Sequence, residues 1–301
     1  MTLTASLAHE SAVARIRIVH CRPEDRCCGP IEHATTSTLV LPLRGVFVKH
    51  RDPRTHLVAD ICHGVFFNVD EPYRVSHPVD GGDECLAIEP TSDVLREIAG
   101  PQGEAARDKA TFAGSDVLLT AESIVARKSL RHRLARRLAN RLEADETALQ
   151  LLAATTRSAR TDPLRALHAR EQTRYRHEEI VEHTKITLVS EPAQDWTLSA
   201  LAKRVSSSPF HLARMFRRYA GLPLHRYQMM ARLTAALDDV IDTSRDLATV
   251  GVDLGFSSHS HFTAAFRNIF GTTPSLLRRS ANQRDATEMR KILTARKRPF
   301  S

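Results

Sequence analysis

Two histidines separated by one residue are the first feature of this sequence that suggests chemistry. His259 and His261 lie in the hexapeptide SSHSHF, residues 257–262, at a spacing that can bind a metal ion or form a catalytic pair. On a β-strand, residues two apart point to the same face, so both rings can reach one ion. On an α-helix the two side chains diverge by about 200°. The chemistry therefore depends on the element that carries the pair.

The cysteines form a second candidate group, all in the first third of the chain. They are Cys21, Cys27, Cys28, Cys62 and Cys85. An odd number without a secretory signal argues against a disulfide framework. Cys21, Cys27, Cys28 and His33 offer thiolate and imidazole ligands, but their spacing lacks a paired CxxC pattern, and vicinal cysteines fit poorly around a tetrahedral ion. We expect ordinary thiols, with no metal and no cofactor.

The composition indicates a soluble protein of two domains. The chain has 301 residues, of which 42% are hydrophobic and 26% charged, which is enough for two globular cores. The first twenty residues lack the apolar run of a secretory signal, and no apolar segment approaches the length of a membrane span. We expect a cytoplasmic protein without a membrane partner.

The charge is distributed unevenly along the chain. Residues 1–120 contain 12 Lys or Arg and 17 Asp or Glu, whereas the remainder contains 31 and 18, within a net charge of +8. A strongly basic C-terminal part favours a polyanionic partner such as nucleic acid. A solvated basic surface is the alternative that charge alone leaves open.

Residues 36–92 carry the pattern of short strands. The segments VFVKH, HLVADI, VFFNV, YRVSH and CLAIEP are rich in β-branched and aromatic residues, and turn pairs such as Asp52-Pro53 separate them. Strands of this length and spacing predict a small antiparallel sandwich or barrel.

Residues 115–160 carry a helical pattern instead. Leu130, Leu134, Leu138 and Leu142 recur every four residues and predict an apolar stripe on one helical face. The opposite face is predicted to carry Arg127, Arg131, Arg136 and Arg137. A helix pair within the chain or a subunit interface would explain the stripe, which is the best candidate for a dimer contact.

The C-terminal half contains a helix-turn-helix pattern twice. In the first copy a helix from Leu198 follows Thr197 as N-cap, and a second helix begins at Ser208-Pro209 and stops at Gly221. The buried positions of that second helix are Leu212, Met215, Phe216 and Tyr219. They recur fifty residues later at Phe262, Ala265, Phe266 and Ile269, before Gly271. An internal duplication follows from this constant offset.

A further helical pattern joins the two copies. It spans LHRYQMMARLTAALDDVIDTSRD, with Tyr227, Met230, Ala231, Leu237 and Ile241 as its predicted buried side. A rigid helix holds two recognition helices at a fixed separation. If that separation is about 34 Å, they can enter successive major grooves on one face of a duplex.

These motifs resemble the DNA-binding domain of the AraC/XylS family of transcription regulators. The matching segments, within residues 175–280, are SPFHLARMFRRYAGLPLHRY and LGFSSHSHFTAAFRNIFGTTPSLLRR. The second contains the family pattern at Gly255, Phe256, Ser257, Ser260, Phe262, Phe266, Arg267, Gly271, Thr273 and Pro274. The segment GVFVKHRDPRTHLVADICHGVFFNVDEPYRVSHPVDGGDECL resembles the cupin-like sensing domain of some members.

The resemblance implies an α+β protein of two domains. Residues 1–115 would form an antiparallel cupin-like β-barrel that senses an effector, and residues 116–170 a helical dimerisation or linker region. Residues 171–281 would form an all-α domain with two helix-turn-helix units joined by a linker helix, followed by a basic tail at 282–301. The implied function is sequence-specific binding of promoter or operator DNA as a homodimer, with RNA polymerase as a partner if the protein activates transcription.

The outward faces of the second helix in each unit are the predicted DNA contacts. By position in the family motif, the base-reading residues are Phe210, Ala213 and Arg214 in the first unit and His259, Ser260 and Thr263 in the second. The arginine can bond guanine O6 and N7 as a fork. Phosphate contacts are expected at Arg217 and Arg267 and at the helix N-termini of Ser208 and Ser258.

A metal-dependent cupin enzyme with a DNA-binding appendage is the alternative function. Such enzymes resemble one another in an HxH pair on barrel strands, but His50, His56, His63 and His77 stand singly among the predicted strands. We therefore expect a non-enzymatic regulator with a small-molecule effector. The sequence assigns no residues to the effector site.

Overall fold

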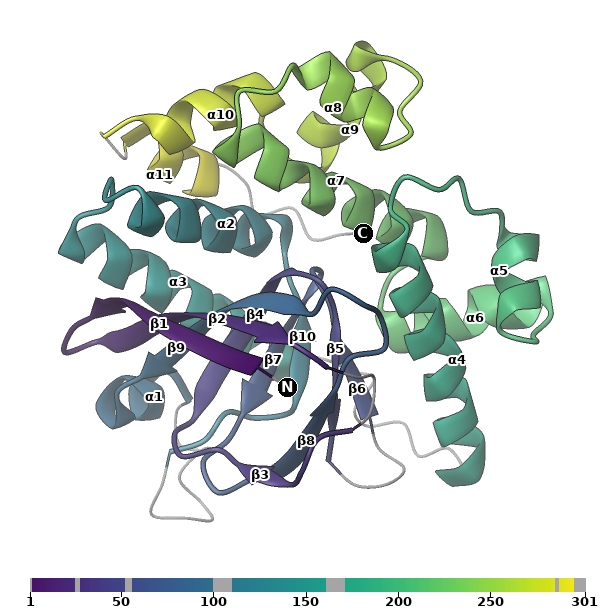
Figure 1. Cartoon of the computed structure of the whole chain (residues 1–301), viewed down its shortest axis with the longest axis horizontal. Coiled ribbons are helices and arrows are strands. Elements are labelled where there is room, and N and C mark those ends of the chain that lie inside the picture. Colours follow the sequence, from purple (N-terminus) through teal and green to yellow (C-terminus); the bar gives the residue numbers. More distant parts are fainter. Residues whose placement is uncertain are drawn as a thin grey trace.

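The computed structural model describes residues 2–24, 28–51, 56–99, 110–160, 171–284 and 287–294. Two antiparallel β-sheets make up the N-terminal part, and most of the helices lie above them and to their right in the view of Figure 1. None of the described helices has the length and apolarity needed to cross a membrane.

The larger sheet has six strands in the order β1-β2-β9-β4-β7-β10. Their bounds are Thr2–Glu10, Ala14–Arg22, Asp83–Pro90, Thr38–Arg44, His63–Phe67 and Asp116–Leu118. The smaller sheet has the order β3-β8-β5-β6, with bounds Glu32–His33, Pro72–Ser76, Phe47–His50 and His56–Ala59. Within the described residues no strand pairing joins the two sheets. The predicted closed barrel is therefore wrong, and the domain is a two-sheet sandwich.

The central strand β9 separates two hydrophobic clusters. Leu86 and Ile88 belong to the main core under the helices, whereas Cys85 belongs to a smaller cluster between the sheets. This alternation follows from the two-residue period of a strand, in which successive side chains point to opposite faces. One strand thus contacts both the interior of the sandwich and the helical layer.

The hairpin of β1 and β2 lies outside the predicted strand region. Strand β2 pairs with β9 in register, with Cys21 opposite Asp83 and Ile16 opposite Ile88. Strand β1 is exposed along most of its length, although Leu3, Ala5 and Leu7 alternate with Thr2, Thr4 and Ser6. The alternating buried Ala14 and Ile16 at the start of β2 are the signal that could have revealed the hairpin.

The predicted stripe of leucines is divided by a turn. Helix α2 spans Ala121–Ala135 and α3 spans Arg141–Arg160, and Arg137 between them has a φ of 53°. Leu130 is buried on α2, but Leu142 is 64% exposed on α3. Arg127, predicted on the solvent face, is fully buried. The single continuous stripe is therefore wrong, because the chain reverses before its last member.

Of the remaining helices, those of the two helix-turn-helix units and the linker between them follow the predicted pattern closely. Helix α1 spans Ser92–Ala99 and α4 spans Glu171–Ser190. The first helix-turn-helix consists of α5 and α6, at Leu198–Arg204 and Pro209–Ala220. The linker helix α7 spans Leu224–Asp242, and the second unit consists of α8 and α9, at Leu247–Asp253 and His259–Phe270.

Two helices follow the second unit, where a tail is expected from residue 282. Helix α10 spans Pro274–Asn282 and α11 spans Thr287–Thr294. Met289 on α11 is buried, so this part of the expected tail is folded onto the main core. Residues 295–301 lie outside the described residues.

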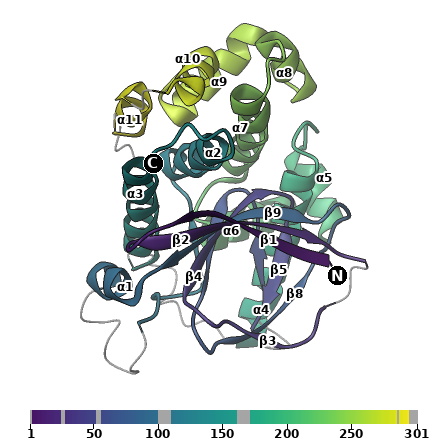
Figure 2. The ribbon, with the colours of Figure 1, turned by 60° about the vertical axis from the view of Figure 1, so that its left-hand side comes forward.

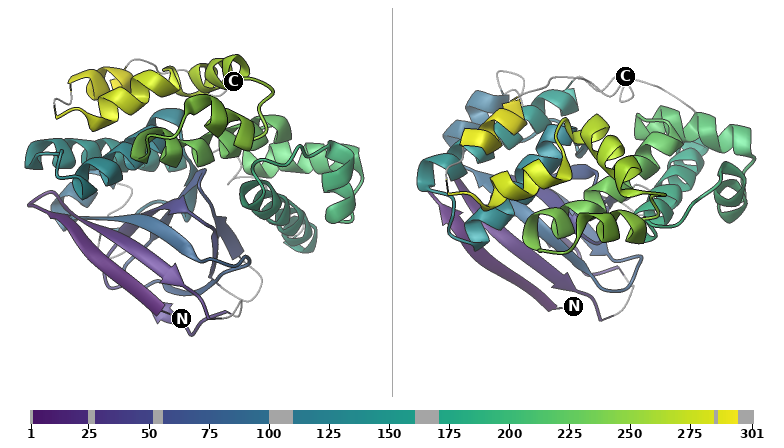
Figure 3. Two further views of the ribbon diagram at one scale, coloured as in Figure 1. Left: turned by 45° about the horizontal axis from the view of Figure 1, so that its top comes forward. Right: turned by 90° about the horizontal axis from the view of Figure 1, so that it is seen from above.

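Helix α2 lies between the six-stranded sheet and the C-terminal helices. It contacts β4 on one side and α7, α9, α10 and α11 on the other. Figure 2 shows α7 and α10 stacked above α2, and Figure 3 shows the same layering from two further directions. The C-terminal helices are thus packed directly onto the N-terminal domain.

Candidate nucleic-acid interface and ligand cavity

The first helix-turn-helix presents a defined outward face. The Ser208 side chain caps α6 by accepting a hydrogen bond from the backbone N–H of His211 at 3.2 Å. Pro209 follows as the first helical residue, and Gly221 ends the helix with a φ of 74°. Leu212 and Phe216 are buried against the rest of the unit. The positions between them are left to face solvent.

Most of the predicted contacts of this unit are exposed. Phe210 is 77% exposed, an unusual state for a large aromatic side chain, and Arg214 and Arg217 are also exposed. Ala213 is half-buried. The ring of His211 instead packs against α4, with its centroid 5.1 Å from that of His177.

The second unit repeats this construction. Ser258 caps α9 by accepting from the backbone N–H of His261 at 3.1 Å, and Gly271 ends it with a φ of 72°. On α9, His259, Ser260 and Arg267 are exposed, and Thr263 is half-buried.

The histidine pair is now placed in the first turn of this helix. His259 Nε2 lies 3.4 Å from Thr263 Oγ1, whereas His261 Nδ1 lies 3.1 Å from Ser257 Oγ. The ring of His261 also packs edge-on against Phe256. The two rings therefore have separate partners, and their helical setting excludes a shared metal ion.

Close packing fixes α8 on α9. A Cβ atom added at Gly251 would lie 2.9 Å from Cβ of Phe262, which is fully buried. The corresponding pair in the first unit is Ala202 and Leu212, also buried. A smaller residue on α8 thus accommodates a larger one on the recognition helix.

Five further arginines could extend the basic surface of the two units: Arg204, Arg218, Arg226, Arg278 and Arg279. Several of them have partners within the protein, among them Arg278 and Arg204. Arg278 donates to the backbone carbonyls of Val240 and Asp239 at the end of α7, at 3.0 and 3.1 Å. Arg204 lies over the ring of Trp196, with its guanidinium carbon 5.4 Å from the ring centroid.

The linker helix α7 is attached to the N-terminal domain by two carboxylates. Asp238 accepts from Arg44 at 2.7 Å and from Lys128, and Asp242 accepts from Arg131 at 3.0 Å and from His132. Burial lowers the pKa of Lys128 to about 8, against the opposing effect of Asp238. The two acidic residues lie one helical turn apart, so both face the same basic surface.

Deeper in the same interface lies a buried polar group. Asp60, at the start of the turn before β7, accepts from Tyr227 of α7 and from His63 Nδ1 at 2.9 Å. His63, singled out in the sequence beside Cys62, therefore contacts the linker helix. It does not line the cavity between the sheets.

A cavity of about 270 Å³ lies between the two sheets, close to the lower end of the range typical of small-molecule sites. Its apolar lining includes Val19, Val40, Phe47, Phe67 and Val75. Its polar lining includes Cys21, Glu32, His77 and Asp83.

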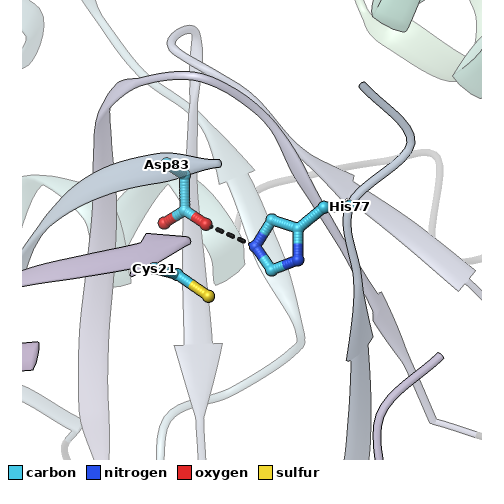
Figure 4. A group of neighbouring side chains, drawn as sticks. All are labelled: Cys21, His77 and Asp83. Carbon is cyan, nitrogen blue, oxygen red and sulfur yellow. Dashed lines mark hydrogen bonds and ion pairs between the residues drawn. The ribbon is translucent and has the colours of Figure 1, made fainter. Parts of the chain in front are cut away.

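Three of these polar residues converge (Figure 4). The atoms of Cys21, His77 and Asp83 that could bind a metal ion all lie within 4.8 Å of one another, and His77 Nε2 is 2.7 Å from Asp83 Oδ1. Burial, with a contribution from the Asp83 charge, raises the pKa of the Cys21 thiol to about 11. No local spacing in the sequence marks this group; only the pairing of β2 with β9, which sets residue 21 opposite residue 83, could have revealed it.

Of the four possible ligands named in the sequence, Cys21 is in this group and Cys28 and His33 are exposed outside it, whereas Cys27 lies outside the described residues.

Comparison with known proteins places the C-terminal part in a family. A helix-turn-helix domain family matches residues 201–280. The transcriptional regulator ArgR from Pseudomonas aeruginosa is 36% identical over 88 residues, which cover 29% of this chain and about a quarter (26%) of ArgR. The regulatory protein SoxS from Salmonella typhimurium is 32% identical over 100 residues, which cover 33% of this chain and 92% of SoxS.

A solved structure also aligns with part of this chain. A transcriptional regulator from Chromobacterium violaceum, described as containing an AraC-type DNA-binding domain, is 26% identical and covers 35% of this chain and 95% of its own, with a TM-score of 0.34. The SoxS match spans nearly the whole of that protein at 32% identity. The chain therefore belongs to the AraC/XylS family of transcriptional regulators.

Proposed function

We propose that this protein binds specific sequences of double-stranded DNA at promoters or operators and regulates transcription there. The observation that carries the proposal is the pair of capped recognition helices, α6 and α9, on either side of one buried linker helix. Each leaves an exposed face free of packing partners from the main core. Membership of the family and the basic charge of the C-terminal part support the same function.

Base reading is assigned to Phe210, Ala213 and Arg214 in α6 and to His259, Ser260 and Thr263 in α9. Phosphate binding is assigned to Ser208, Arg217, Ser258 and Arg267. The exposed guanidinium of Arg214 has the reach for a bidentate contact with guanine, and the exposed ring of Phe210 suits a thymine methyl group. Ala213 and Thr263 are half-buried, so a base must approach the helix closely to contact these side chains.

A selection of bound genomic fragments followed by gel-shift titration tests this function. We expect tighter binding to selected fragments than to scrambled ones of equal length, by a factor of about 10³ or more at physiological salt. Equal affinity for both at every salt concentration would contradict sequence-specific regulation.

The cavity between the sheets is the proposed effector site. Strand β9 supports this assignment because it connects the cavity to the linker helix. Asp83 and Cys85 line the cavity, while Glu84 between them accepts from Arg131 at 3.0 Å on the opposite face. Arg131 in turn donates to Asp242 of α7. A ligand that moves Asp83 thereby acts on the helix that carries both DNA-binding units.

The proposed regulator is cytoplasmic and non-enzymatic, and acts as a homodimer that recruits RNA polymerase if it is an activator. The exposed Leu142 on α3 is the candidate dimer contact that remains from the leucine stripe. Sedimentation equilibrium of the full chain and of Leu142→Glu tests it: we expect a dimer for the first and a weakened dimer for the second. Monomeric wild-type protein would contradict the assignment.

A further inference from the structure

The cavity between the sheets contains a group of side chains whose chemistry fits a metal ion. Cys21 lies on β2, Asp83 on the neighbouring β9, and His77 on the segment that follows β8 (Figure 4). All three side chains are buried: Cys21 is 5% exposed, and the side chains of His77 and Asp83 are 2% and 6% exposed. Ligand-forming atoms of three different types thus meet in a protected place, held by strand pairing.

The spacing of these atoms is close to that of a metal site. With bonds of about 2.0–2.3 Å in a tetrahedron, zinc ligands lie about 3.3–3.8 Å from one another. Here the three donor atoms lie within 4.8 Å of one another, and the shortest separation is 2.7 Å, between His77 and Asp83. An ion that replaces this hydrogen bond needs only small rotations of the side chains.

The donor set also selects the kind of ion. A thiolate together with an imidazole favours zinc and neighbouring divalent transition metals over magnesium and calcium, which take oxygen ligands. Cys85 completes the surroundings, because its Sγ donates to the second carboxylate oxygen of Asp83 at 3.0 Å. Such a contact orients a ligating carboxylate without occupying a position on the metal.

We propose that Cys21, His77 and Asp83 bind a zinc-type divalent ion whose fourth position opens into the cavity. Three protein ligands and one open position are the arrangement in which zinc also binds water or a small molecule. The thiolate and the carboxylate balance the two positive charges, so the loaded site is neutral in its apolar cavity. The role of this ion as an effector rests on the proposed regulatory function; its binding does not.

Cobalt binding to the full chain tests the site, because a cobalt–thiolate bond gives an absorption band that reports the cysteine ligand. We expect one equivalent of Co²⁺ per chain, displaced by Zn²⁺ and unaffected by excess Mg²⁺. Cys21→Ala removes the band and weakens Zn²⁺ binding at least tenfold. Cys62→Ala is the matched control, since Cys62 is also buried in the same domain but belongs to no such group among the residues that the structure describes. It should bind cobalt like the wild type.

Asp83→Asn provides an independent comparison, because it keeps the shape of the side chain and removes its charge. Thermal unfolding in the presence of a chelator shows whether each variant is folded. If one variant is unfolded, the binding comparison is made with the other. Wild-type protein that binds no cobalt, or a folded Cys21→Ala or Asp83→Asn variant that binds zinc as tightly as wild type, would overturn the proposal.

Gel-shift titration of the same samples separates the metal site from the proposed function. We expect the affinity for selected DNA fragments to differ at least threefold between zinc-loaded and chelator-treated protein, and this difference to vanish in Cys21→Ala. Sequence-specific DNA binding without a cobalt band overturns the metal site alone. A cobalt band without sequence-specific DNA binding overturns the regulatory function and supports the metal site.

Discussion

Arg214 and Arg217 stand one turn apart on the exposed face of α6, yet they are expected to contribute differently to DNA binding. Arg214→Ala should weaken binding to a selected fragment by about 1–3 kcal/mol and relax the preference at one base position. Arg217→Ala should weaken binding to all sequences alike and flatten the salt dependence, because phosphate contacts carry no sequence information. Gel-shift titrations against a set of single-base variants measure both effects. Unchanged affinity in both substitutions would refute these assignments.

The buried side chain of Lys128 leads to a prediction of how the free energy of unfolding depends on pH. Burial lowers its pKa to about 8 from an ordinary value of 10.5, so between these values the unfolded chain binds more protons at this residue than the folded one. Its contribution to the free energy of unfolding therefore rises with pH from about 8 to about 10.5. Below pH 8 the cost of burying the charge is constant.

Lys128→Met isolates this contribution, because every other titrating group is shared between the two proteins. Urea unfolding at intervals from pH 7 to pH 10 should show the stability difference, wild type minus variant, increasing above pH 8. A difference that stays flat or falls over this range would show that the lysine is not held in a desolvated state.

At the scale of elements, the packing of α8 against α9 depends on one glycine. Gly251→Ala would place a methyl group 2.9 Å from Cβ of Phe262, and both residues are buried, so one helix must shift to relieve the contact. We expect a loss of about 1–3 kcal/mol in the free energy of unfolding, typical of overpacking. Phe262→Leu should restore much of it in the double variant, because the first unit has Ala202 and Leu212, both buried, at the corresponding positions. Chemical denaturation of the four proteins of this cycle measures the rescue; additive losses would contradict it.

The same elements show what the sequence could predict. Caps such as Ser208 and stop signals such as Gly221 and Gly271 are local, so the helices from α5 to α10 follow from neighbouring residues alone. The turn at Arg137 has no glycine or proline to mark it, and four-residue spacing continued through it by coincidence. The stripe was therefore extended across a chain reversal.

Of the two candidate sites, only the DNA-binding surface could be predicted from the sequence. The outward positions of α6 and α9 could be assigned because a helix fixes which side chains share a face. The meeting of Cys21, His77 and Asp83 could not, because it depends on which strands are neighbours and in what register. Strand pairing is set by contacts distant in sequence, which a single sequence does not display.

At the scale of the whole molecule, the linker helix α7 joins the helix-turn-helix units to the N-terminal domain. Asp238 accepts from Lys128, whose side chain is 5% exposed, and from Arg44. Its neighbour Asp239 instead pairs with the surface residue Arg245 at 2.7 Å. Removing a carboxylate from the first pair leaves a buried ammonium group without its partner, whereas the second pair lies in solvent, where ion pairs contribute little.

Asp238→Asn should therefore destabilise the protein by about 3 kcal/mol, the lower end of the range for breaking a buried ion pair, because the carboxylate is itself 22% exposed. Asp239→Asn, the matched control one residue away, should cost less than about 1 kcal/mol. Calorimetry should also show the single transition of the wild type separating into two in Asp238→Asn, as the DNA-binding helices lose their attachment to α2 and β4. If the two variants unfold alike, this ion pair does not attach α7 to the sensing domain, and the path from the cavity to DNA must depend on the buried contact between Tyr227 and Asp60.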